Sequence, residues 1–299
     1  MSKIAKIAAI AALMGASASA SAWWGGGPWG GSGWDNNYNR GLGYGNTSGW
    51  GDGWGSGDAA GAGDFSMNMS GRGNTNMRGY GSGYGGLEHR WSSSLVCARD
   101  SLPARGDDAV GEAYRTFLGL ASHEYFHSWN VKRMKPAAFT PYELSGEAYT
   151  GLLWVFEGIT SYYDDLALVR SGLITEQSYL ELLGRTITRV LRGSGRLRQS
   201  VEESSFDAWT KFYKQDANAA NAIISYYAKG ALIALALDLK LRAETGGNCT
   251  LDDVMQEAWR RWGETGEGMP EDGFETLSAE VSGVDLEDFF DATVRGTGE

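Results

Sequence analysis

Cysteine, basic charge and long apolar runs are all scarce in this 299-residue chain. The two cysteines, Cys97 and Cys249, lack the spacing of zinc ligands, and the sequence leaves open whether they pair. Lys and Arg number 26 against 37 Asp and Glu, which gives a net charge of −11. Because phosphate binding needs clustered Lys and Arg, we expect no nucleic-acid partner.

The apolar run nearest the start is short. It extends from Ile7 to Met14, follows Lys3 and Lys6, and precedes the small residues 15–22. This order is typical of a secretory signal peptide, here residues 1–22 with cleavage after Ala22. Because the run is too short to cross a bilayer, we expect no membrane span in the mature chain and a periplasmic or secreted location.

Residues 23–86 lack valine and isoleucine and contain one leucine, Leu42. They hold about half of the chain's 44 glycines and half of its 12 tryptophans. Such a Gly-, Trp-, Tyr- and Asn-rich segment cannot bury enough apolar surface to offset the entropy lost on ordering. We expect low-complexity, disordered chain here, with possible self-association through its aromatic residues.

Histidine is nearly as scarce, with three residues, and two of them stand in His123-Glu124-Tyr125-Phe126-His127. On a helix this spacing places two imidazoles on one face, as a zinc site requires, with a carboxylate beside them to accept a proton. The alternative is a helix with two ordinary core histidines. The flanking sequence predicts the helix, with an acidic start at Gly106–Asp108. The inward stripe is predicted to be Val110, Ala113, Phe117, Leu120, His123 and His127.

A catalytic zinc needs a third protein ligand, and Glu157 is the candidate. It lies in an apolar, helix-like segment from about Tyr149 to Arg170, which Gly172 ends. Burying a carboxylate there is costly unless it binds a cation, although Glu157 could instead face water. We expect one Zn²⁺ per chain.

Several segments together resemble one enzyme family. Residues 85–299 are similar to the catalytic domain of the glycyl aminopeptidases, gluzincin zinc metallopeptidases that usually carry a PDZ domain. The resemblance implies that His123, His127 and Glu157 bind zinc and that Glu124 is the general base. The matching segments are Gly86–Arg90, Ser122–Arg133, Trp154–Asp165, Glu203–Tyr213 and Ser225–Gly230.

The same resemblance suggests two further roles, and the position of Asp164, seven residues after Glu157, suggests a third. Tyr227, in a Tyr-x-Lys-Gly motif, would donate to the oxyanion of the tetrahedral intermediate, with Tyr226 as the other candidate and simple helix packing as the alternative. Glu88 would bind the substrate's free amine, or it is a solvated loop carboxylate. Asp164 would orient a liganding histidine, or it is an exposed helix charge.

The N-terminal part resembles a different family. The signal peptide, residues 23–31 and residues 65–74 are similar to sulfur globule proteins of sulfur-oxidising bacteria. Relatives of the peptidase-like part carry a β-rich domain before it and continue toward a PDZ domain, so residues 87–299 would be a truncated catalytic domain.

The expected fold is mainly α with a small β-sheet, of the thermolysin-like gluzincin type. The expected function is removal of N-terminal Gly or Ala from peptides by a zinc-dependent aminopeptidase. The alternative is a self-assembling envelope protein of the sulfur-globule type whose peptidase-like domain is inactive.

We expect a substrate-binding edge strand within about His89–Cys97. Further helices are expected at Leu180–Arg192, Ile223–Arg242 and Leu251–Trp262.

Overall fold

The structure, a computed structural model, describes residues 85–298 except 105, 107–109 and 144. The signal peptide and residues 23–84 of the predicted low-complexity segment lie outside the described residues. So do Asp107 and Asp108 at the predicted helix start. The strands are β1 (Gly85–Glu88), β2 (Ser93–Val96), β3 (Lys135–Pro136) and β4 (Gly268–Met269). The longer helices are α5 (Glu112–Phe126), α6 (Ile159–Arg170), α7 (Glu176–Arg192), α8 (Val201–Phe206), α10 (Ala228–Glu244), α11 (Leu251–Ala258) and α12 (Gly273–Ser282).

Short helical segments connect these elements. Three of them have the wide π-helical turn, and the others are 3₁₀ turns or single α-helical turns. They are η3 (Arg99–Ser101), η4 (Ala137–Phe139), η5 (Trp154–Gly158), η6 (Ser194–Leu197), η7 (Phe212–Lys214), α9 (Ala219–Ala222), η8 (Trp259–Gly263), α13 (Glu287–Phe290) and η9 (Asp291–Arg295).

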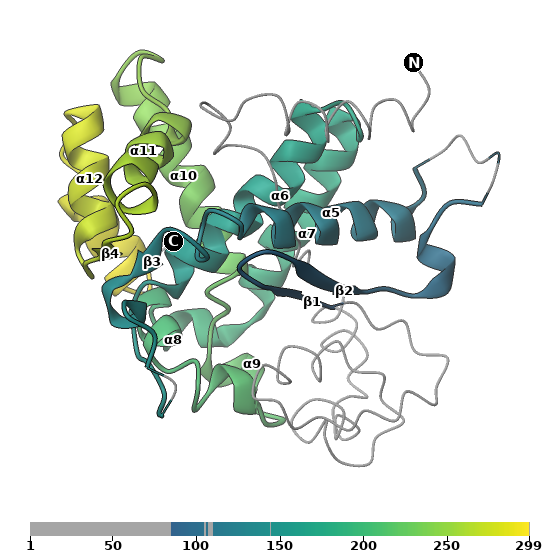
Figure 1. The fold of residues 1–299 in the computed structure, drawn as a ribbon, viewed down its shortest axis with the longest axis horizontal. Coiled ribbons are helices and arrows are strands. Elements are labelled where there is room, and N and C mark those ends of the chain that lie inside the picture. The colour runs from purple at the N-terminus through teal and green to yellow at the C-terminus, as the bar shows by residue number, and fades with distance from the viewer. Residues whose placement is uncertain (1–84, 105, 107–109, 144, 299) are drawn as a thin grey trace. The chain divides into compact units, whose positions relative to one another are not determined.

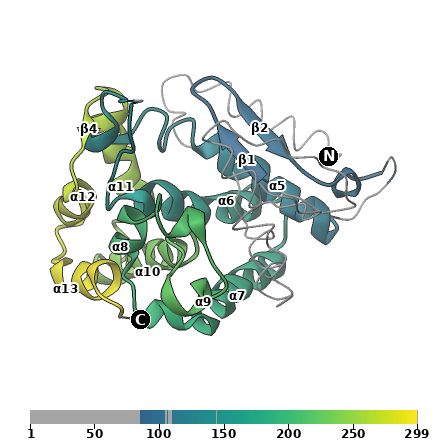
Figure 2. The ribbon, with the colours of Figure 1, turned by 90° about the horizontal axis from the view of Figure 1, so that it is seen from below.

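The described residues form two compact units. One comprises the described chain up to residue 128 together with 163–186 and 213–217. Its centre is α5, and the β1–β2 hairpin packs along this helix (Figures 1 and 2). Leu118 of α5, Leu168 of α6 and Ile174 form its buried apolar cluster.

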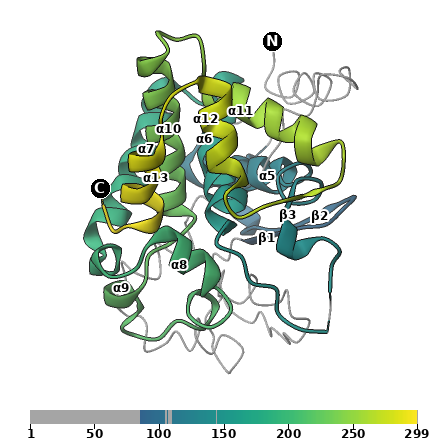
Figure 3. The same cartoon turned by 90° about the vertical axis from the view of Figure 1, so that its left-hand side faces the viewer.

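The other unit comprises 129–162, 187–212 and the described residues from 218 onward. Trp154 is 1% exposed and packs edge-on against Phe274, with ring centroids 5.6 Å apart. Phe290 contacts the same indole at 6.2 Å. Helix α11 packs against both α10 and α12 (Figure 3).

The prediction of a mainly helical fold with a small sheet is confirmed for the described residues. They contain two two-stranded sheets, β1–β2 antiparallel and β3–β4 parallel. Strand β2 falls inside the predicted range His89–Cys97. Strand β1 was not predicted, because glycine is depleted in strands and Gly85 and Gly86 form its first half. It also begins before residue 87, where we expected the catalytic domain to start.

Helix positions agree with the sequence patterns more closely than helix starts do. Helix α6 ends at Arg170, and Gly172 follows with φ of +70°, as the predicted stop requires. Helix α5 begins at Glu112, later than the predicted start at Gly106–Asp108. Ala113, predicted to face inward, is exposed because it lies in the solvated first turn, whereas Leu120 is buried.

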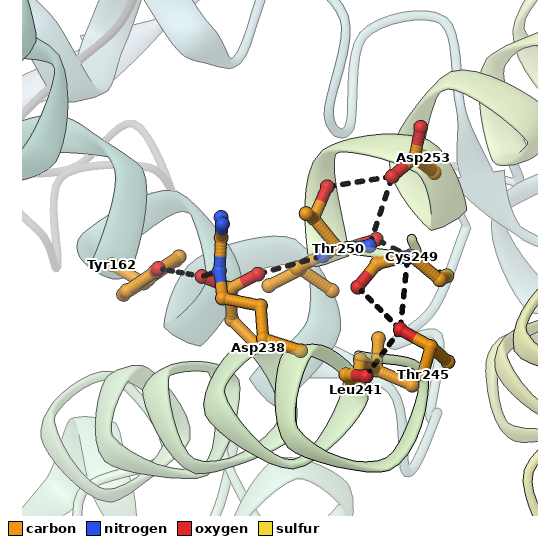
Figure 4. A network of polar contacts seen from close by, with 9 residues as sticks. Tyr162, Asp238, Leu241, Thr245, Cys249, Thr250 and Asp253 are labelled. Atoms are coloured by element: carbon orange, nitrogen blue, oxygen red, sulfur yellow. Dashed lines mark hydrogen bonds and ion pairs between the residues drawn. The ribbon is translucent and has the colours of Figure 1, made fainter. Parts of the chain in front are cut away.

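A buried carboxylate joins α10 to the start of α11. Asp238 is 4% exposed and accepts hydrogen bonds from Tyr162 Oη at 2.9 Å and from Arg242 Nε at 2.9 Å. Its other oxygen accepts from the backbone N–H of Leu251 at 2.8 Å, one of the N–H groups that a helix start leaves unpaired (Figure 4). Thr250 and Asp253 complete a capping box at this helix start.

The described residues include both cysteines, and each is a free thiol. Cys97 is half-buried and Cys249 is buried. Burial raises the pKa of both thiols.

Among the described helices, none combines the length and apolar character that crossing a bilayer requires.

Helix α10 approaches η5 closely because two glycines face each other. A Cβ placed on Gly158 would lie 2.6 Å from Gly230 Cα and 2.8 Å from the carbonyl oxygen of Tyr226. Both obstacles are backbone atoms, which cannot rotate away. This contact therefore requires glycine at position 158.

Replacing Gly158 with alanine should destabilise the protein. Because overpacking strains the surrounding backbone, we expect Gly158→Ala to lower the free energy of unfolding by about 1–3 kcal/mol. The control is Gly184→Ala on α7, where a Cβ meets nothing within 4 Å. That exposed helical position should gain roughly 0.5–1 kcal/mol. Urea unfolding followed by circular dichroism measures both values, and equal midpoints for Gly158→Ala and wild type would contradict the close contact.

Candidate metal centre

His123 and His127 lie one turn apart near the end of α5. His123 is 0% and His127 is 1% exposed, and their ring centroids are 4.7 Å apart. The backbone N–H of His127 still donates to the carbonyl of His123 at 3.2 Å, so the helical turn that pairs the two rings is intact. The predicted helical placement of the two imidazoles is therefore what the structure has.

Asp164 orients one of these rings. Its Oδ2 lies 3.1 Å from Nδ1 of His123, and its side chain is 1% exposed. Ser122 reinforces the contact by donating from Oγ to the carbonyl oxygen of Asp164 at 2.9 Å. Because Nδ1 is engaged by the carboxylate, Nε2 is the nitrogen of His123 available to a metal ion. Of the two readings of Asp164, the buried orienting carboxylate is the one observed.

The electrostatics of Asp164 reflect this burial. Loss of solvent raises the pKa of the carboxyl well above its usual value, and repulsion from the neighbouring Asp165 carboxylate raises it further. The backbone N–H of Asp165, which donates to Oδ1 of Asp164, acts in the opposite direction.

Glu157 lies two turns before Asp164 on one continuous helical segment, η5 followed by α6. Its side chain is half-buried, so it neither faces water fully nor enters the apolar core. Segment η5 has a π-helical turn, in which the backbone N–H of Ile159 bonds to the carbonyl of Trp154. Such single wide turns are frequent at functional sites, because the extra residue re-aims a side chain.

Side chains compensate for the altered backbone hydrogen bonding of this turn. Asn130 Nδ2 lies 3.0 Å from the carbonyl oxygen of Val155 and 3.4 Å from that of Phe156. Thr160 Oγ1 donates to the Phe156 carbonyl at 2.6 Å. The N–H of Trp154 donates to Ser205 Oγ at 3.1 Å. The wide turn is therefore fixed by specific contacts.

His123, His127 and Glu157 offer ligand atoms that all lie within 4.8 Å of one another. Two imidazoles and one carboxylate form a donor set that suits a catalytic zinc ion, which keeps a fourth position for water or substrate. The Asp164 carboxylate behind His123 is the outer support that such ligands commonly have. The residues present therefore fit a divalent metal of the zinc type.

Glu124 lies on α5 between the two histidines and is 2% exposed, and strand β1 passes directly over it. A Cβ placed on Gly86 would lie 2.1 Å from Oε1 of Glu124 and 2.5 Å from its Cγ. Ser93 of β2 adds a hydrogen bond of 3.3 Å to the Glu124 carbonyl. The hairpin therefore shields the predicted general base, and it does so with a residue that has no side chain.

The two candidate tyrosines differ in burial. Tyr226 is 0% exposed, with its ring centroid 4.6 Å from that of Phe212. Tyr227, at the N-terminus of α10, is half-buried, and its ring centroid lies 5.6 Å from that of Phe212.

Glu88 is half-buried at the end of β1, opposite Ser93 in the strand register. Glu88 is therefore part of a strand and not of a loop.

Three contributors to this region escaped the sequence reasoning. Asn130 follows the histidine motif in Ser128-Trp129-Asn130, and only its position beside the motif hinted at a role. Gly86 and Gly158 contribute through the close packing that their missing side chains allow, which a sequence pattern does not reveal.

Removing the support behind His123 should weaken metal binding. We expect Asp164→Asn to lower zinc affinity by about 10–100-fold, the range typical of lost second-layer hydrogen bonds. Competition against a fluorescent zinc chelator measures the affinity. Asp165→Asn, which leaves the Asp164–His123 hydrogen bond in place, should bind zinc nearly as tightly as wild type. Equal affinity for all three proteins would show that Asp164 does not support the metal.

Comparison with known proteins shows which family this region resembles. Residues 116–233 match the family model described as M61 glycyl aminopeptidase. A crystal structure of an aminopeptidase N family protein from Idiomarina loihiensis is 50% identical, with a TM-score of 0.71, over 73% of this chain. This chain spans 37% of that protein. A comparison with curated proteins gives no match.

The comparisons support one of the two resemblances seen in the sequence. The likeness of the N-terminal part to sulfur globule proteins receives no support. The likeness to glycyl aminopeptidases is confirmed for the segment that carries both histidines, Glu124 and Glu157. Residues 116–233 of this chain are therefore similar to an M61 glycyl aminopeptidase domain.

Proposed function

We propose that this chain is a zinc-dependent aminopeptidase of the gluzincin type that removes small N-terminal residues, glycine or alanine, from peptides. The observation that carries the proposal is the convergence of His123, His127 and Glu157, whose ligand atoms lie within 4.8 Å of one another. The match of residues 116–233 to the M61 family model supports peptidase chemistry. The preference for small residues rests on the family's description as glycyl aminopeptidases.

His123, His127 and Glu157 would hold the zinc ion. When bound, the ion supplies a Lewis acid that lowers the pKa of water toward neutrality and polarises the scissile carbonyl. Glu124 accepts the proton of the attacking water and passes it to the leaving amine. Its burial under β1 keeps bulk water away from this carboxylate, which strengthens its interactions with reacting groups.

Tyr227 is the proposed oxyanion donor. It is half-buried, so its hydroxyl can reach a bound substrate, whereas Tyr226 is fully buried against Phe212 and suits packing. Its location at the start of α10 adds a favourable partial positive charge near a developing oxyanion.

The β1–β2 hairpin is the proposed substrate platform. Main-chain pairing with a strand grips an extended peptide regardless of most side chains. Glu88 at the end of β1 would bind the substrate's N-terminal ammonium group through its negative charge. That contact would restrict cleavage to the first residue of a peptide.

Removing the general base should abolish turnover while leaving the metal bound. We expect Glu124→Gln to lower kcat/KM for glycyl and alanyl anilides by about 10²–10⁴-fold, the usual contribution of a positioned base. Zinc content, measured by mass spectrometry, should stay at one ion per chain. A chelator should inactivate the wild-type protein, and added zinc should restore it. Zinc-loaded wild type that leaves every small aminoacyl anilide intact would instead favour a non-catalytic role.

The paired tyrosines provide a matched test of the oxyanion donor. Tyr227→Phe should lower kcat by about 10²–10³-fold with little change in KM, because the hydrogen bond forms only as charge develops. Tyr226→Phe should retain kcat within a few-fold. Similar losses in both variants would mean that the hydroxyl of Tyr227 acts only through packing of the tyrosine cluster.

A further inference from the structure

Lys229 is a buried cation that the proposed catalytic roles do not use. It is 7% exposed in the first turn of α10. Its Nζ is buried and has no hydrogen-bond partner among the described residues. Buried ammonium groups are normally paired with an anion or hydrogen-bonded, because removing them from water is costly.

The charged neighbour of Lys229 is another cation. Burial lowers the pKa of Lys229, and the positive charge of Arg196 lowers it further. Arg196 belongs to η6 and is half-buried, so its side chain also reaches solvent. It donates from Nε to the carbonyl of Leu191 at 3.4 Å, which holds the side chain near the end of α7.

The backbone around these two cations is rigidly packed. A Cβ placed on Gly195 of η6 would lie 2.0 Å from the carbonyl oxygen of Ile223, so η6 and the chain entering α10 are in direct contact. Gln199 Oε1 accepts from the N–H of Ile224 at 3.1 Å, and Ser204 Oγ donates to the Ile224 carbonyl. The segments that carry Arg196 and Lys229 are therefore packed against each other at Gly195 and Ile223.

We propose that Lys229 and Arg196, at the positive end of α10, form a binding site for a compact monovalent anion, either chloride or a single carboxylate group. An anion there neutralises the buried ammonium and relieves its repulsion with the guanidinium. The α10 macrodipole adds attraction, because anions are favoured near helix N-termini. The half-buried Arg196 provides the route of entry, since the ammonium itself is enclosed.

The site is distinct from the proposed catalytic position of Tyr227. Residues 227 and 229 are two positions apart, and two helical positions turn a side chain by about 200°, toward the opposite side of the helix. Anion binding would nevertheless stabilise the turn that begins with Tyr227. The proposal concerns binding and stability, so it does not depend on the peptidase activity.

The test is the melting temperature of the protein at constant ionic strength and pH. Chloride and acetate are each exchanged for isethionate, a bulkier anion, and unfolding is followed by fluorescence. Wild type should show a saturable rise of roughly 3–6 °C when the anion concentration is about ten times its dissociation constant. A response to chloride alone identifies a halide site, and a response to acetate as well identifies a carboxylate site.

Two variants make the result specific. Lys229→Met keeps the length of the side chain and removes its charge, so the anion response should disappear. Lys240→Met, the same change elsewhere on α10, where the ammonium pairs with Glu244 at 3.2 Å, should keep the full response. If Lys229→Met fails to fold, Arg196→Gln serves instead, because Arg196 is half-buried, and it should weaken binding at least about tenfold.

The proposal is overturned if wild type, Lys229→Met and Lys240→Met respond identically to every anion, because the salt effect is then general. It is also overturned if wild type shows no saturable response, in which case Lys229 is held as a neutral amine. Titration calorimetry with chloride on wild type and Arg196→Gln provides the second measurement, and equal heats in both proteins count against the site.

Discussion

The hydrogen bond between His123 and Asp164 is the contact on which the candidate metal centre depends. It links the end of α5 to α6 in an environment from which water is excluded, where a misplaced polar group would be costly. Glu157 belongs to the same continuous helical segment as Asp164. Orienting the imidazole and presenting the carboxylate are therefore coupled through one piece of backbone.

That backbone segment combines regular and irregular features. The π-helical turn of η5 gives Glu157 its direction, and its carbonyl groups obtain partners from Asn130 and Thr160. The contact between Gly158 and Gly230 then holds the turn against α10 at a separation that no larger residue would permit. This irregular turn is thus held in place by several independent contacts.

Sequence patterns predicted the parts of this site that follow from periodicity. The spacing of His123 and His127 predicts a shared face on any helix. The apolar surroundings of Glu157 indicated a third ligand, and the family resemblance implied the same residue. Sequence patterns predicted less well whether a residue is buried or forms a strand where this depends on the elements that pack against it. The sequence pattern favoured an exposed helix charge for Asp164, and its burial follows only from the position of α5. Strand β1 was missed because its glycines oppose strand formation, and a neighbouring helix stabilises it despite them.

Gly86 shows that two kinds of boundary in this chain do not coincide. By composition, Gly85 and Gly86 are the last residues of a glycine-rich stretch. By structure, they form the first half of β1, the strand that covers Glu124. A chain shortened on compositional grounds, to begin at Leu87, would therefore lose the backbone that covers Glu124, although its composition would suggest that only linker had been removed.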